Sequence, residues 1–152
     1  MSKIILSEFG KADNNLYIQC GCMMNCSFLR LSKFECFDKV SYHFDLLNDN
    51  VSKIKDCYAI EEDMNQLEYI LKKVAMARDS YSLSLLTESG WFIEVTKVGH
   101  IREHGVLTIE FYKNERKYVK EKTSGGIVVD IKNVSKIRAA IRELVGDKEC
   151  QK

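Results

Sequence analysis

The chain has no proline, one tryptophan and three histidines among its 152 residues. Proline removes a donor from a β ladder, so its absence is compatible with many strands. The sequence also lacks an apolar run of the ~18 residues that a membrane-spanning helix needs. Its first residues hold too short an apolar stretch for a signal peptide, so we expect a cytoplasmic protein with no membrane partner. A net charge of +1 excludes the large basic excess that many nucleic-acid-binding proteins carry.

The familiar catalytic and phosphate-binding motifs are also missing. There is no GxSxG elbow and no Rossmann fingerprint, and Gly125-Gly126 precedes a predicted strand, whereas a phosphate loop precedes a helix. The acidic cluster Glu61, Glu62 and Asp63 lies at a predicted helix start, where it complements the helix dipole. We therefore expect a binding protein without a cofactor, and not an enzyme.

Alternation of apolar and polar residues is abundant in both halves of the chain and has the period of a β-strand. A first strand is expected at 3–9, followed by a turn at 10–15. The other segments with this period are 16–20, 29–31, 40–46, 81–85, 91–95, 107–111 and 127–131.

An amphipathic helix is predicted at the end of each half. Asp63 and Asn133 are expected to be N-caps because their side-chain oxygens can accept hydrogen bonds from free amides. Gly146 suits the left-handed position that ends many helices. Either the two halves are related, or two short amphipathic helices match by chance. The apolar positions have the same spacing in both: Met64, Leu67, Leu71 and Val74, then Val134, Ile137, Ile141 and Leu144.

Together these patterns predict an α+β fold of two pseudo-repeated antiparallel β-sheet units, each closed by a C-terminal helix. The units are residues 1–78 and 79–152. No linker composition separates them, so we expect them to pack as one compact body.

Cysteines and histidines offer two candidate metal sites. Cys20, Cys22 and Cys26 could bind zinc together with another cysteine, but the paired CxxC knuckles of a strong zinc site are missing. The alternative is reduced cysteines that pack as small hydrophobes. His100 and His104 fit the HxxEH pattern of zinc proteases, yet glycines bracket the stretch between two strands. We therefore expect a polar turn there and no catalytic metal.

The segment 112–122 interleaves basic residues with two tyrosines. Such a segment can bind single-stranded DNA or RNA, because cations neutralise phosphates and aromatic rings stack on bases. The alternative is a solvated, lysine-edged strand that resists edge pairing. The candidate contacts are Tyr112, Lys113, Arg116, Lys117, Tyr118, Lys120 and Lys122.

Residues 90–95 (GWFIEV) and 125–141 (GGIVVDIKNVSKIRAAI) give a strand and helix order that resembles the single-stranded-DNA-binding transcriptional coactivator fold, which Whirly proteins also use. The resemblance implies binding of single strands across the sheet and its loops, and a homo-oligomer. It adds outward-facing Phe92 to the candidates beside Tyr112. Glu94 and Glu110 on the same face depart from a basic surface.

The first half is similar to small uncharacterised proteins of Gram-positive phages and prophages, through a CGC-bearing strand, an alternating strand and a βα closing unit. This second resemblance implies an effector that docks on a host protein or a small ligand. Both functions stay open on the sequence.

Overall fold

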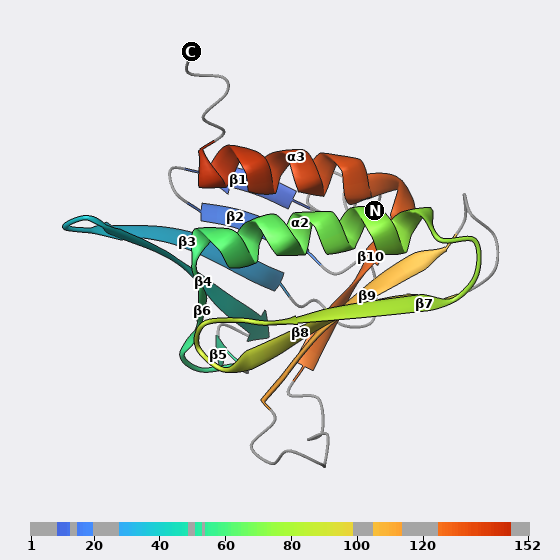
Figure 1. Ribbon diagram of the computed structural model, residues 1–152, viewed down its shortest axis with the longest axis horizontal. Coiled ribbons are helices and arrows are strands. Elements are labelled where there is room, and N and C mark those ends of the chain that lie inside the picture. Colours follow the sequence, from blue (N-terminus) through green and yellow to red (C-terminus); the bar gives the residue numbers. More distant parts are fainter. Residues whose placement is uncertain are drawn as a thin grey trace.

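The computed structural model describes residues 9–12, 15–19, 28–48, 51–52, 54–98, 105–113 and 125–146. Within these residues the fold is α+β, with two antiparallel sheets and two α-helices, as predicted. Figure 1 shows the helices lying side by side over the sheets, while one long hairpin reaches beyond the rest of the molecule.

The first sheet, sheet A, contains six of the described strands, and β4 pairs with both β5 and β6 along one edge. The expected turn at 10–15 is wrong in its first part, because Gly10 and its neighbours pair with the next strand and so override their turn preference. Residues 3–8 of the expected first strand lie outside the described residues. The strands are β1 (Phe9–Ala12), β2 (Asn15–Gln19), β3 (Phe28–Cys36), β4 (Lys39–Asn48), β5 (Val51–Ser52) and β6 (Cys57–Ala59).

The second sheet, sheet B, has the strand order β10-β9-β8-β7. Its inward rows follow the predicted alternation. Gly126 is required by close packing, since a Cβ atom there would lie 2.6 Å from the backbone oxygen of Ile109. The strands are β7 (Tyr81–Leu86), β8 (Trp91–Val98), β9 (Val106–Lys113) and β10 (Gly125–Asp130).

The first helix, α2 (Glu61–Met76), begins two residues before Asp63, the predicted cap. Ile60 is the N-cap, and Asp63 occupies the third helical position, so its prediction as N-cap is wrong. The Asp63 carboxylate reaches back and accepts a hydrogen bond from the Ile60 amide at 3.1 Å. Asp63 still satisfies a free backbone amide, because the side chain of the third helical residue can accept from the N-cap amide, as in a capping box.

The second helix, α3 (Val134–Val145), follows a 3-10 turn, η1 (Ile131–Asn133). Asn133 is its N-cap, as predicted, but its side chain makes no capping hydrogen bond. The side chain of Asp130 instead caps the 3-10 turn by accepting from the Lys132 amide at 3.2 Å. Gly146 ends the helix with φ of 92°, which confirms its predicted left-handed role.

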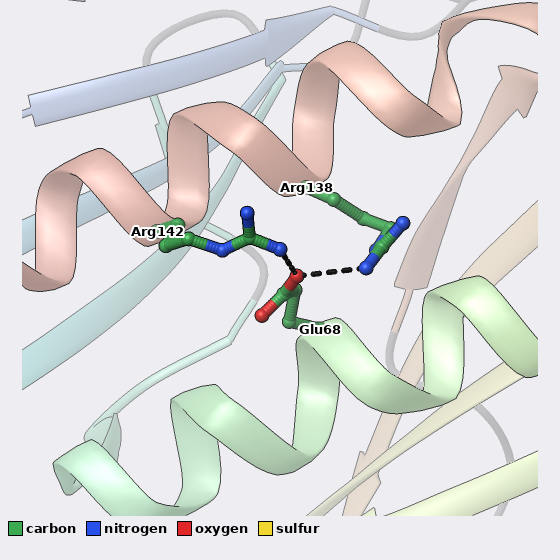
Figure 2. A network of polar contacts seen from close by, with 3 residues as sticks. All are labelled: Glu68, Arg138 and Arg142. Carbon is green, nitrogen blue, oxygen red and sulfur yellow. Dashed lines mark hydrogen bonds and ion pairs between the residues drawn. The ribbon is translucent and has the colours of Figure 1, made fainter. Parts of the chain in front are cut away.

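Each helix contacts the sheet of the other half. Helix α2 packs against β7 and β8 as well as β4 and β6, whereas α3 packs against β2. The Lys33 ammonium of β3 donates to the Val145 carbonyl at the end of α3, at 3.4 Å. Figure 2 shows Glu68 of α2 pointing toward α3, where one of its carboxylate oxygens accepts from both Arg138 and Arg142.

Buried residues from both sheets and both helices form one hydrophobic cluster. The rings of Phe44 in sheet A and Phe111 in sheet B lie 5.7 Å apart, so the halves share a core. All eight apolar helix positions that the spacing selected are buried in this cluster.

Candidate nucleic-acid interface

Sheet A turns a row of aromatic side chains away from the core. Leu29 and Leu31 of β3 point inward, so Phe28, Arg30 and Phe34 point outward on the same strand. Phe34 is 53% exposed, although full burial of such a ring would be favourable. We call this surface the aromatic face and define it as Tyr17, Phe28, Phe34, His43 and Tyr58.

Three rings of the aromatic face contact one another across β3, β4 and β6. Phe34 meets His43 edge to face with ring centroids 4.7 Å apart, and His43 lies 5.7 Å from Tyr58. The Nε2 atom of His43 is 3.2 Å from the Ser41 hydroxyl. Strand pairing fixes the backbone beneath these rings, because His43 is opposite Tyr58 in the ladder. The arrangement is a preformed ring surface on rigid strands.

One guanidinium lies within this face. Arg30 donates to Asp45 at 2.9 Å, and this hydrogen bond is the main reason why the pKa of Arg30 is raised. Its Nε is buried and has no hydrogen-bond partner among the described residues. Arginine stacks on aromatic planes and donates to phosphate oxygens. The face therefore combines ring surfaces with one cation that is held in place by a carboxylate.

The outer face of sheet B differs from the aromatic face in the exposure of its rings and in its charge. Phe92 and Tyr112 stack with their centroids 5.2 Å apart, but Tyr112 is only 7% exposed. Glu94 stands directly opposite Glu110 in the next row. Like charges so placed destabilise a strand pair and repel phosphates. Of the two sheets, sheet A exposes the larger row of aromatic rings among the described residues.

Lys113, the first lysine of the predicted segment, lies where the two sheets meet. Its ammonium is 5.7 Å from the centroid of the Trp91 ring, and the Trp91 indole donates to the Lys55 carbonyl at 3.0 Å. Close by, the Tyr58 amide donates to the Ser89 hydroxyl at 3.0 Å. The contacts place the start of the basic segment beside β6, whose Tyr58 belongs to the aromatic face.

The remaining sequence candidates lie outside the described residues. They are the basic segment residues Arg116, Lys117, Tyr118, Lys120 and Lys122, the cysteines Cys20, Cys22 and Cys26, and the histidines His100 and His104. In the described part of the chain, no group of three or more histidine, cysteine or acidic side chains could hold a metal ion. Cys57 is buried, and burial raises the pKa of its thiol to about 12.

The aromatic face was not among the sequence candidates, although the alternation contained the necessary signal. Once Leu29 and Leu31 are assigned to the core, the same period places Phe28 and Phe34 on the opposite face. Bulky apolar residues at positions where polar ones are expected are informative. The contribution of Tyr58 depends on the pairing of β6 with β4, which periodicity does not show.

No protein-family model matches the chain, and no curated protein matches it. Within the described residues, no helix is long and apolar enough to cross a membrane.

Proposed function

We propose that the protein is a non-enzymatic binding protein that holds single-stranded nucleic acid across the aromatic face of sheet A. The observation that supports this most directly is the exposure of Phe28, Phe34 and Tyr58 around Arg30 on one rigid surface. Exposed rings suit single strands because every base presents a flat apolar surface, whereas a duplex hides it.

The strand would leave the aromatic face beside Tyr58 and continue toward Lys113 and the basic segment. In this proposal the rings bind bases, while the lysines and Arg116 of the segment neutralise phosphates. In the second half, four strands followed by a helix have the order on which the proposed resemblance to the single-stranded-DNA-binding coactivator fold is based.

Binding to a labelled oligothymidylate, followed by fluorescence anisotropy, tests the proposal. Replacing Phe34 by alanine removes one stacking ring and should weaken binding about 5- to 150-fold, because each stacked base contributes about 1–3 kcal/mol. Leu86→Ala, an exposed truncation on sheet B, is the matched control and should bind like the wild type.

An abasic oligonucleotide of the same length separates stacking from charge. It should bind the wild type more weakly than the normal strand, and this difference should be smaller for Phe34→Ala, which has lost one ring of the aromatic face. Absence of binding at low salt would remove the proposal, and equal affinity of the wild type for both strands would remove the role of the aromatic face.

The alternative function, docking on a protein partner, is favoured by a different observation. The end of the β3–β4 hairpin exposes apolar side chains that the nucleic-acid proposal does not use.

A further inference from the structure

Strand β7 is an edge strand of sheet B, and its outer side has no partner strand among the described residues. The Thr87 amide donates to the Trp91 carbonyl at 2.8 Å and continues the register of β7 with β8, so Thr87 bonds toward β8. Backbone groups alternate between the two sides of a strand. The amides and carbonyls of Ser82, Ser84 and Leu86 therefore point away from β8. An exposed row of this kind is a ready template for another strand.

The sequence of β7 lacks the features that usually protect an edge strand. Natural edges are protected by lysines and other charges, by proline or by a bulge. The strand reads YSLSLL and has no charged residue, whereas β8, β9 and β10 of the same sheet each contain at least one. Its pairing with β8 is continuous, so no bulge turns the edge away. These features suit a strand that has a second partner when the protein is at work.

Two copies of β7 match each other when they pair antiparallel about a two-fold axis at Ser84. Ser84 of one copy then lies opposite Ser84 of the other, and Ser82 lies opposite Leu86, so every residue of the outward row has a hydrogen-bonding partner. On the core side, half-buried Leu83 lies opposite Leu85. A strand that pairs with its own copy places each charge near a like charge, and β7 avoids this cost because it has none.

Helix α2 favours a second copy over a foreign strand. It lies along β7 and runs in the opposite direction (Figure 1). The Asp63 carboxylate at its start accepts from the Glu88 amide just beyond β7, at 3.0 Å, whereas Lys73 near its end lines the same hollow as Tyr81 at the start of β7. The first turn of α2 is acidic and its last turn is basic. Two-fold pairing brings the acidic start of each α2 toward the basic end of the other, a match that a foreign strand lacks.

We propose that the protein forms a two-fold dimer through β7, in which the two copies of sheet B join into one continuous antiparallel sheet. Both copies use the same surface, so the contact closes at two molecules and does not extend into a filament. Leu86, which is 54% exposed, gains Ser82 of the other copy as its cross-strand neighbour. The dimer uses no residue of the aromatic face, so it does not depend on nucleic-acid binding.

Proline at position 84 separates the dimer from the fold of the monomer. Because the Ser84 amide points away from β8, Ser84→Pro keeps the β7–β8 hydrogen bonds but removes the central hydrogen bonds of the dimer. Sedimentation velocity over a range of concentrations should show dimers for the wild type and for Ser84→Ala, which keeps the amide. Ser84→Pro should raise the dissociation constant at least about tenfold, with an unchanged circular dichroism spectrum. Wild-type protein that stays monomeric at millimolar concentration, or Ser84→Pro that dimerises as tightly, would overturn the proposal.

Cross-linking tests the register and does not require the proline variant to fold. Opposite Cα atoms in a hydrogen-bonded antiparallel pair are about 5.5 Å apart, within the range of a disulfide. Ser84→Cys should therefore form covalent dimers on mild oxidation, above the background that the wild-type cysteines give. Leu86→Cys is the matched control: alone it should stay at background, and mixed with Ser82→Cys it should cross-link. Ser84→Cys that stays at background would overturn the two-fold pairing, and a monomeric wild type that binds a synthetic β7 peptide would assign the edge to a foreign strand instead.

Discussion

Replacing Glu68 by glutamine tests whether α2 and α3 are held together by charge. Glu68 has a side chain that is 17% exposed, and one of its oxygens accepts from Arg138 at 2.9 Å and also from Arg142 (Figure 2). Glutamine keeps the size and one carbonyl oxygen but removes the negative charge. Arg138 and Arg142, which both lie on α3, then lose the carboxylate that they share.

The expected magnitude follows from the burial of each partner. Arg138 is largely buried, and hydrogen bonds to charged groups of this kind contribute about 1.5–3 kcal/mol. Arg142 is about half exposed, so its share should be nearer the 0.2–1 kcal/mol of surface pairs. Because glutamine can still accept one hydrogen bond, we expect a net loss of about 2 kcal/mol in the free energy of unfolding.

Urea titration gives the measurement. With a slope of about 2 kcal/mol per molar urea, the midpoint should fall by about 1 M while the slope stays the same. Glu88→Gln, an exposed change in the turn between β7 and β8, is the control and should stay within about 0.5 kcal/mol of the wild type.

A double-mutant cycle isolates the interaction between the helices. Glu68→Gln and Arg138→Gln should together cost less than the sum of the single changes, by about 1 kcal/mol. Additive changes, or a loss from Glu68→Gln no larger than in the control, would show that the ion pairs do not hold the helices together.

Two further outcomes follow from close packing and from burial of acidic groups. Gly126→Ala should lower the free energy of unfolding by more than about 2 kcal/mol, because its Cβ would overlap the Ile109 backbone; a melting temperature equal to that of the wild type would contradict this. Burial also raises the pKa values of Cys57 and Tyr42 to about 12. Both groups keep their protons to higher pH in the folded state. The stabilising contribution of Cys57 is therefore complete below about pH 9 and that of Tyr42 below about pH 10, and each falls above that pH by about 1.4 kcal/mol per pH unit. Urea titrations at pH 9 and 10 should show a shallower loss in Cys57→Ala than in the wild type, and parallel losses would refute the assignment.

The sequence predicted the local elements well because periodicity is a local property. The alternation from Tyr42 to Leu46 and the helical spacing from Val134 to Leu144 are both confirmed by burial, whereas Val40 at the start of the predicted row is exposed. These patterns identify which side of an element faces the core, but not which other element covers it. The contact of α3 with β2 therefore had no signature in either segment.

The start of α2 shows a further limit of prediction from the sequence. An aspartate can accept amide hydrogen bonds when it is the N-cap residue of a helix, and also when it is the third helical residue. The sequence is compatible with either position for Asp63. The structure uses the third position, where the same oxygen also accepts from the Glu88 amide at 3.0 Å. The turn between β7 and β8 competes for that carboxylate, and it is 25 residues away in the chain.

For the candidate nucleic-acid interface, the sequence predicts which residue types are available, but it does not predict how far the fold covers each side chain. The sequence selected Tyr112 for its ring and outward direction, yet the side chain is covered in the folded protein. Phe34 has the same kind of ring and remains exposed. The difference arises from what packs above each strand, and that is decided by the tertiary structure.

Each helix packs against the sheet of the other half, and this arrangement has a consequence for how the chain folds. Helix α3 covers β2, and the contact between Lys33 and Val145 joins residues that are 112 positions apart. Pairings at such separation must close a long loop before they stabilise anything, which slows folding. During synthesis, α3 cannot cover β2 until residues 134–145 have been made. An apolar strand that is uncovered during that time is prone to aggregation.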